Sequence, residues 1–188
     1  KLSQITGKVK RYVKRGRVFV IIIETNISND IRGGKTMKIY ELQERTTLLP
    51  VLLTIWEDSV RATHHFLSDT EIEQIREYVP QALQNVSHLL VAQNESGESI
   101  GFMGTENNRL EMLFLSPKEC GKGIGKQMLQ YGMEQYGIRE LTVNEQNPQA
   151  VVFYTHLGFE TYKRADCDEE GNSYPLLYMT LKDTEGKI

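Results

Sequence analysis

The segment that most constrains the fold of this chain is 110–126, LEMLFLSPKECGKGIGK. Its first six residues form an apolar run that predicts a buried strand, and Ser116 and Pro117 end that run. Three alternating glycines follow at positions 121, 123 and 125, and a helical pattern of apolar residues begins directly after them. Glycines let the backbone approach a ligand closely, and the free amides at a helix N-terminus attract anions. The segment therefore predicts a strand, a glycine loop and a helix that together bind a phosphate group.

Two common phosphate-binding loops do not match this segment. The dinucleotide pattern G-x-G-x-x-G needs a third glycine where Lys126 stands, and the nucleoside triphosphate pattern needs a hydroxyl where Gln127 stands. The run C-G-K-G-I-G instead resembles the pyrophosphate loop of the GNAT N-acetyltransferase superfamily, [RQ]-x-x-G-x-[GA]. Gly123 and Gly125 fall on its two small positions, and Cys120 stands where Arg or Gln is usual. Taken alone, the loop is equally compatible with a tight turn that binds nothing.

A second segment, 144–159, reads NEQNPQAVVFYTHLGF and strengthens this resemblance. Asn147 is a favourable helix N-cap, Pro148 suits the first helical position, and Gly158 suits the C′ position. The segment resembles the later GNAT motif N-x-x-A-x-x-[FL]-Y-x-x-x-G-F almost residue for residue. The order of the two motifs and their separation also match, and the resemblance covers most of the chain, from Met37 to about Lys182.

The rest of the chain predicts an α/β fold. Strands are expected at 37–42, 88–92, 99–103, 109–115, 138–143, 159–165 and 176–181, and helices at 48–65, from 69 to about 78, at 124–136 and at 148–157. The second helix is expected because Ser68 and Glu71 form a capping box. The resulting order, β-α-α-β-β-β-α-β-α-β-β, gives a mixed, mostly antiparallel sheet flanked by helices, and it is the order of the GNAT fold.

The resemblance implies that acetyl-coenzyme A binds where the fourth and fifth strands separate. The main chain of Leu113, Phe114 and Leu115 is expected to pair with the pantetheine arm, and one of these amides to polarise the thioester carbonyl. Asn147 is expected to cap its helix and to bind the same arm. The pyrophosphate is expected on the amides of a run of six residues, Gly121, Lys122, Gly123, Ile124, Gly125 and Lys126.

The resemblance also identifies Tyr154 as the candidate general acid, which protonates the leaving thiolate during transfer of an acetyl group to an amine. The alternative for Tyr154 is a packing role. Some relatives use a Glu on the fifth strand as the base, and Thr142 occupies that place here. His64, at the end of the first helix, and Glu111 are therefore the candidate bases. A capping or core role for His64 and a solvated strand face for Glu111 stay open.

Charge divides the chain into two parts. Residues 1–36 hold nine Lys/Arg and two Asp/Glu, a net charge of +7, whereas residues 37–188 hold thirteen and twenty-three, a net charge of −10. The codons of 32–34 can contain a bacterial ribosome-binding sequence, so we expect Met37 to be the native start and 1–36 to be a basic extension upstream of it. The rival reading is a nucleic-acid-binding arm, which the scarcity of aromatic residues makes less favoured. Residues 17–23 form a strong strand pattern that could pair with a second copy, so a homodimer is a further possibility.

Composition limits the function further. The two cysteines, Cys120 and Cys167, form neither a disulfide framework nor a metal site, and no apolar run is long enough to cross a membrane. These features predict a cytoplasmic enzyme without a metal. The acidic body favours a cationic acceptor, either a small amine or a peptide amine, and Asp58 and Tyr174 are further candidate contacts. The alternative function is a sensor or interaction module that binds acyl-coenzyme A without transfer.

Overall fold

The computed structural model describes residues 37–168 and 171–182, so the basic extension 1–36 lies outside the described residues. The strands are β1 (Lys38–Glu41), β2 (His88–Gln93), β3 (Ser99–Glu106), β4 (Arg109–Leu115), β5 (Glu140–Asn144), β6 (Phe159–Ala165) and β7 (Leu176–Leu181). The helices are α1 (Leu49–Thr63), α2 (Asp69–Arg76), α3 (Val79–Asn85), α4 (Ile124–Tyr136) and α5 (Pro148–His156), with a short 3-10 turn, η1 (Pro117–Glu119), before α4. The predicted fold class is confirmed, and β4, α4, β6 and β7 begin and end where the sequence predicts.

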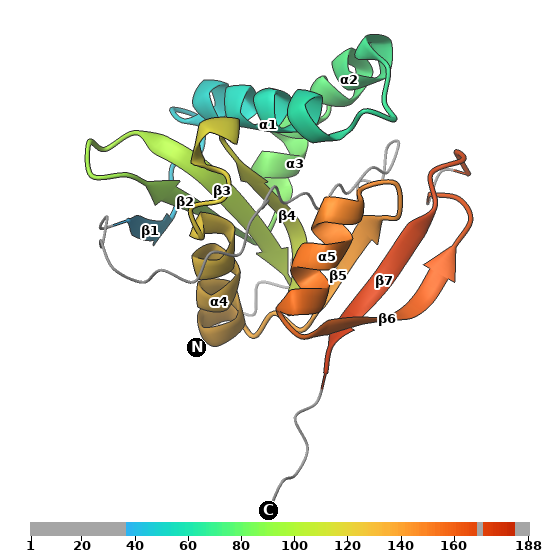
Figure 1. Ribbon diagram of the computed structural model, residues 1–188. Coiled ribbons are helices and arrows are strands. Elements are labelled where there is room, and N and C mark those ends of the chain that lie inside the picture. The colour runs from blue at the N-terminus through green and yellow to red at the C-terminus, as the bar shows by residue number, and fades with distance from the viewer. Residues whose placement is uncertain (1–36, 169–170, 183–188) are drawn as a thin grey trace, which may run out of the picture.

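The seven strands of the described residues form one mixed sheet in the order β1-β2-β3-β4-β5-β7-β6. Every neighbouring pair is antiparallel except β4 and β5, which are parallel. Figure 1 shows α1, α2 and α3 on one side of the sheet and α4 and α5 on the other. Two apolar cores follow from this layering. The larger one lies under α4 and α5, and the second lies under α1 to α3 against β2, β3 and β4.

The region after α1 differs in one respect from the prediction. The capping box forms, because the Ser68 hydroxyl accepts from the Glu71 amide while the Glu71 carboxylate accepts from the Ser68 amide. The helix that follows ends at Arg76 and not near Tyr78, and a further short helix, α3, begins at Val79. Pro80 lies in the first turn of α3, where a missing N–H costs no helical hydrogen bond. Proline therefore starts a helix here as well as ending the one before it.

The parallel pair of strands at the centre of the sheet separates soon after it forms. β4 pairs with β5 at Arg109–Glu140 and Leu110–Leu141, and no further pair follows. The next residue, Glu111, is an extra residue relative to β3, because Thr105 pairs with Leu110 and Gly104 pairs with Met112. A β-bulge of this kind bends its strand and increases its twist. The bulge therefore lies where β4 turns away from β5 and the sheet opens.

Candidate active site

Beyond Leu110, β4 has main-chain groups on the side of β5 that pair with no described strand, and Leu113 and Leu115 are buried there. Ser116 N–H donates to Ile100 O of β3 over 2.8 Å. In an antiparallel pair, every second residue of a strand directs its main-chain N–H and C=O toward the partner strand. Phe114, two residues earlier, therefore also directs its main chain toward β3. Leu113 and Leu115 direct theirs the other way, into the opening. Of the three residues predicted to pair with the cofactor arm, Leu113 and Leu115 have main-chain groups directed toward the opening, whereas the Phe114 side chain stacks on Phe102 in the second core.

The glycine loop leads directly into α4. Gly121 and Gly123 have φ of +75° and +77°, a region that L side chains rarely adopt, and Gly123 is the N-cap of the helix. No side chain caps α4, so the amides of its first turn have no side-chain acceptor. Of the two lysines, the exposed Lys122 is paired with Glu119 over 3.0 Å, and Lys126 is exposed at the start of α4. The predicted loop is therefore an open helix N-terminus that can hold an anion.

Asn147 and Tyr154 bring buried polar atoms to α5. Asn147 caps this helix, because its Oδ1 accepts from the Ala150 amide over 3.1 Å. The Nδ2 of Asn147 and the hydroxyl of Tyr154 are buried, and neither has a hydrogen-bond partner within the protein. The Tyr154 side chain is fully buried, in edge contact with the rings of Phe153 and Phe159. Burial raises the pKa of its hydroxyl well above the ordinary value of a phenol, so this group keeps its proton at neutral pH.

These observations test whether acetyl-coenzyme A fits the residues present. Its pantetheine arm offers amide groups, which can pair with the main chain of Leu113 and Leu115, and its pyrophosphate suits the uncapped start of α4. A buried donor without an acceptor costs about 1–3 kcal/mol. The donors on Asn147 and Tyr154 can recover this cost by bonding a ligand. The residues therefore fit the predicted donor.

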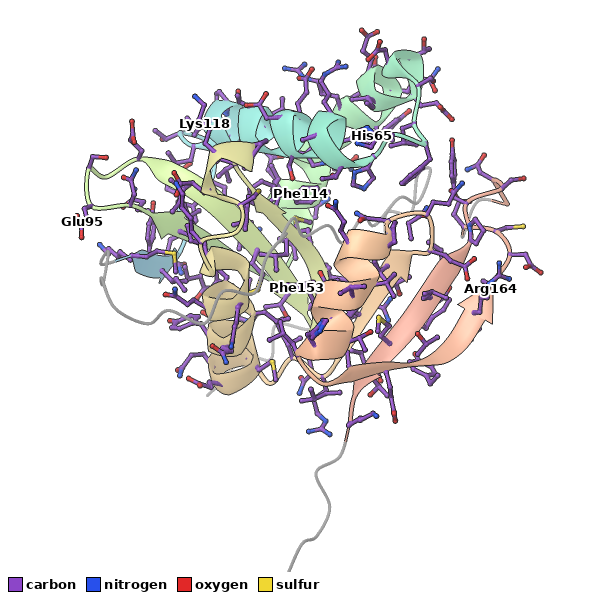
Figure 2. All side chains as sticks on the ribbon, in the orientation of Figure 1. His65, Glu95, Phe114, Lys118, Phe153 and Arg164 are labelled. Carbon is purple, nitrogen blue, oxygen red and sulfur yellow. The ribbon has the colours of Figure 1, made fainter. Side chains whose placement is uncertain are left out.

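The two adjacent histidines at the end of α1 have different surroundings. His64 is the C-cap of α1, 2% exposed, with Nδ1 2.9 Å from the Thr63 hydroxyl and its ring 5.1 Å from that of Phe66. Burial lowers the pKa of His64 from 6.5 to about 4, so the imidazole is neutral at pH 7. His65 is exposed, and Figure 2 shows it at the end of α1 that faces α5.

Glu111 and Thr142 lie on the two strands that separate. Glu111 is half-buried at the bulge, with Oε1 3.3 Å from Nε of Arg109. Thr142 is buried, and its hydroxyl is hydrogen-bonded to the guanidinium of Arg109. Arg109 therefore links β4 to β5 in the short region where they pair, and Thr142 offers no carboxylate on β5.

A groove of about 290 Å³ lies between the end of α1 and the start of α5. It is lined by Ala62, Thr63, His65 and Phe66 on one side and by residues 146–149 on the other. Behind Phe66 lies Tyr174, whose ring is 5.8 Å from that of Phe66 and whose hydroxyl is hydrogen-bonded to Glu71. The loop before β7 thus contacts the α1–α2 region, while the other predicted contact, Asp58, is exposed on α1.

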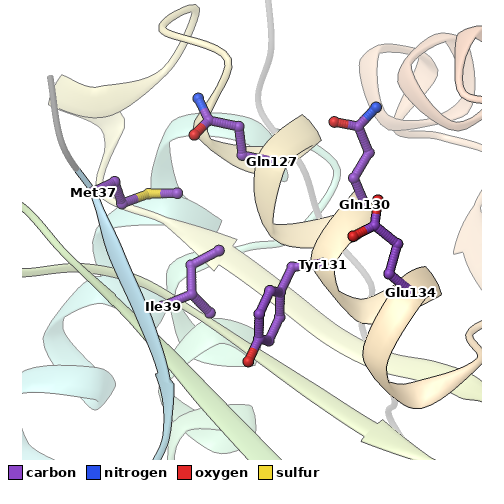
Figure 3. A pocket seen from close by; sticks show the side chains of 6 residues that line it. All are labelled: Met37, Ile39, Gln127, Gln130, Tyr131 and Glu134. Atoms are coloured by element: carbon purple, nitrogen blue, oxygen red, sulfur yellow. The ribbon is translucent and has the colours of Figure 1, made fainter. Parts of the chain in front are cut away.

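A second hollow, of about 390 Å³, lies between β1 and α4 and is drawn in Figure 3. Its lining comes from Met37 and Ile39 on one side and from Gln127, Gln130, Tyr131 and Glu134 on the other. No predicted site residue lines this hollow. It shares no lining residue with the α1–α5 groove and is separate from it.

Sequence reasoning missed two features of this site. The first is the bulge at Glu111, because one extra residue does not visibly change the pattern of a mostly apolar strand. The second is Asn144, which is 5% exposed at the end of β5 and has an unpartnered Nδ2. The available signal for Asn144 was a second asparagine shortly before the cap residue Asn147.

A sheet that opens at a parallel pair, with a glycine loop beside the opening and a buried tyrosine on α5, defines a class of acyl-coenzyme A-dependent acyltransferases. The sequence profile of the acetyltransferase (GNAT) domain matches residues 52–181. The chain belongs to the GNAT family, it is an acetyltransferase, and it uses acetyl-coenzyme A. This confirms the predicted family, enzyme class and acetyl donor.

Similar proteins include bacterial and archaeal acetyltransferases. The peptidyl-lysine N-acetyltransferase YjaB of Salmonella typhimurium is 38% identical over 128 residues, which cover 68% of this chain and 88% of that protein. The solution structure of apo YjaB from Escherichia coli has a TM-score of 0.70 and 32% identity, covering 77% of this chain and 97% of that one. The PaiA N-acetyltransferase of Thermoplasma acidophilum, solved with coenzyme A, has a TM-score of 0.58 and 25% identity, covering 77% of this chain and 99% of that one.

Among the described residues, no helix combines the length and the apolar character that crossing a membrane requires. In the same part of the chain, no three His, Cys, Asp or Glu side chains are grouped so that they could hold a metal ion.

The buried His64 predicts a pH dependence of stability. Its pKa is about 4 in the folded protein and about 6.5 when exposed, so the unfolded chain binds the extra proton as the pH falls through this window. Folding stability attributable to His64 is present above pH 6.5 and is lost toward pH 4, by on the order of 3 kcal/mol in all. Urea unfolding at several pH values should show a smaller acid loss in His64→Gln than in the unchanged protein.

The control is His65→Gln, which replaces the exposed neighbour and should keep most of the acid loss, because burial is the main cause of the lowered pKa of His64 and the nearby charge of His65 is a smaller one. Equal slopes of unfolding free energy against pH in His64→Gln and the unchanged protein would show that His64 does not titrate as its burial requires.

Proposed function

We propose that this acetyltransferase moves the acetyl group of acetyl-coenzyme A to the primary amine of a lysine in a peptide or protein, by direct attack of the amine. The observation that carries the proposal is the buried, unpartnered hydroxyl of Tyr154 on the helix beside the opened strands. The acceptor is inferred from the relatives named peptidyl-lysine N-acetyltransferase. When bound, acetyl-coenzyme A supplies the acetyl group as a thioester.

The opened edge of β4 binds the donor and stabilises charge. The main-chain groups of Leu113 and Leu115 pair with the pantetheine arm, and one of their amides donates to the thioester oxygen as negative charge develops there. Such a donor is fixed by the strand and needs no reorganisation, which makes it effective in a water-poor site. Phe114, whose main chain is directed toward β3, contributes through packing.

The glycine loop and the start of α4 hold the pyrophosphate. The amides from Gly121 to Lys126 lie at the uncapped N-terminus of α4, where the helix dipole adds favourable partial charge. Lys126 adds a further positive charge, while Lys122 is partly neutralised by its pair with Glu119. Asn147 Nδ2 donates to the pantetheine arm, which satisfies its buried N–H.

Tyr154 is the general acid of this mechanism. Its hydroxyl keeps its proton at neutral pH because burial raises its pKa, and it donates that proton to the departing sulfur. In the protein alone the hydroxyl has no hydrogen-bond acceptor. A bound group that accepts a hydrogen bond from it removes the free-energy cost of a buried, unpaired donor.

The base is proposed to be Glu111, with His64 as the alternative. Glu111 lies at the bulge, on the strand that lines the opening, and its carboxylate can accept a proton from the amine directly or through water. His64 is the C-cap of α1 and packs against Phe66, and its pKa of about 4 makes it a weak base at neutral pH. If His64 is the base, the acidic limb of the rate profile lies near pH 4 and not at pH 6 to 7.

Replacing Gly123 by valine should abolish stabilisation by acetyl-coenzyme A. At φ +77° a valine is strained, and its side chain occupies the space where the ligand approaches the loop. The matched control is Gly97→Val, since Gly97 has a φ of +81° and also has open space around it, but lies in the β2–β3 turn. Both variants should lose similar stability, and only Gly123→Val should lose the ligand-induced rise in melting temperature. Calorimetric titration that gives equal affinities in both variants would contradict the loop assignment.

Tyr154→Phe should lower kcat by roughly 10²–10⁴-fold, the usual worth of general acid catalysis, with little change in affinity for acetyl-coenzyme A. Because the hydroxyl is buried without a partner, its removal should leave the melting temperature unchanged or higher. Tyr131→Phe, on α4, is the control and should keep full activity. Steady-state assays of thiol release on a lysine peptide measure both. Full activity in Tyr154→Phe would return Tyr154 to a packing role, and ligand binding without any turnover in the unchanged protein would favour the sensor function.

A further inference from the structure

Asn144 is a buried polar residue for which the proposed mechanism gives no role. It is the last residue of β5, three residues beyond the last pair with β4, and it is 5% exposed. Leu141 and Val143 belong to the core under α4 and α5. Because side chains alternate along a strand, Thr142 and Asn144 face the opposite side of the sheet, the side on which α1 and α2 lie.

The amide of Asn144 is held in one orientation. Its Oδ1 accepts from the Gln146 amide over 2.8 Å, which uses the oxygen to form the turn that leads to α5. Its Nδ2 must then point away from that turn, and this atom is buried with no hydrogen-bond partner in the protein. A buried N–H group without an acceptor is unfavourable, so a fixed donor of this kind is suited to a ligand that brings an acceptor.

The face on which Asn144 lies indicates which ligand that is. The donor thioester is proposed to lie along the edge of β4, with Tyr154 on the α5 side of the sheet, so the attacking amine comes from the other side. Asn144 lies on that other side, and the residues that follow it, 146–149, line the groove between α1 and α5. The lining of this groove includes no carboxylate and no Lys or Arg side chain. It therefore offers hydrogen bonds and apolar surface to an acceptor, and not complementary charge.

Resting on the proposed transfer to lysine, we propose that Asn144 Nδ2 donates a hydrogen bond to a main-chain carbonyl oxygen of the acceptor polypeptide. This bond makes Asn144 a specificity-determining residue. It selects a lysine that is part of a peptide over an amine that has no carbonyl group, such as a polyamine or an alkylamine. A site built to hydrogen-bond its substrate discriminates strongly against an analogue that lacks the group, because the buried donor is then left without a partner.

The test compares two acceptors in two variants. The acceptors are a lysine with both ends blocked as amides, and n-butylamine, which has the amine and four carbons of the lysine side chain but no carbonyl. Asn144→Asp keeps an oxygen for the Gln146 amide and removes the N–H donor. The matched control is Asn94→Asp in the exposed β2–β3 turn, where Oδ1 likewise accepts from the backbone amides of Ser96 and Glu98.

In Asn144→Asp the ratio of kcat/KM for the blocked lysine to kcat/KM for butylamine should fall roughly ten- to hundredfold, the cost of leaving a buried group unpaired. The new carboxylate attracts an ammonium ion, so activity on butylamine should stay constant or rise. Because both rates come from one preparation, partial unfolding cancels in the ratio. Asn94→Asp should leave the ratio unchanged.

A ratio unchanged in Asn144→Asp would overturn the role of Asn144, as would a loss of affinity for acetyl-coenzyme A with no change in acceptor preference. Binding separates this proposal from the transfer itself. Titration of the blocked lysine into protein saturated with coenzyme A should show weaker binding in Asn144→Asp even where turnover is absent. Binding of the blocked lysine without turnover in the unchanged protein would contradict the proposed transfer. The titration alone would then test the role of Asn144.

Discussion

The short pairing of β4 with β5 is the constraint on which the rest of the site depends. Two parallel pairs form, an extra residue at Glu111 bends β4, and the strands separate. Main-chain N–H and C=O groups inside a protein require partners, so an opened strand edge in a covered sheet is unfavourable unless a ligand completes it. β4 and β5 thus lie on the two sides of an opening, and a peptide-like ligand such as the pantetheine arm can fill it.

The same logic applies to the side chains around the opening. Tyr154, Asn147 and Asn144 each bury a donor that has no acceptor within the protein. Groups of this kind lower stability and are retained where function requires them. We propose different tasks for them: Tyr154 on α5 and its cap residue Asn147 contact the donor, and Asn144, on the opposite face of the sheet, contacts the acceptor. In this proposal the two faces of the sheet beside one opening hold the contacts to the donor and the contact to the acceptor separately.

Much of this architecture could be predicted from the sequence, because strong local signals and tertiary structure agree. Gly123 and Gly137 bound α4 in the left-handed conformation that glycine tolerates, and Asn147 caps α5 as its motif predicts. Features set by pairing between strands could not be predicted. The bulge at Glu111 depends on the register with β3, and the different directions of Leu113 and Phe114 depend on which strand each one pairs with. The burial that lowers the pKa of His64 to about 4 depends on tertiary packing, in which its ring contacts that of Phe66.

Amide hydrogen exchange measured by NMR tests the central claim most directly, namely that the opened edge of β4 is the binding surface for the donor. The amide of Phe114 is directed toward β3, whereas those of Leu113 and Leu115 face the opening. On addition of coenzyme A, exchange at Leu113 and Leu115 should slow strongly, while the already protected Phe114 changes little. Binding of coenzyme A with unchanged exchange at both Leu113 and Leu115 would contradict the account.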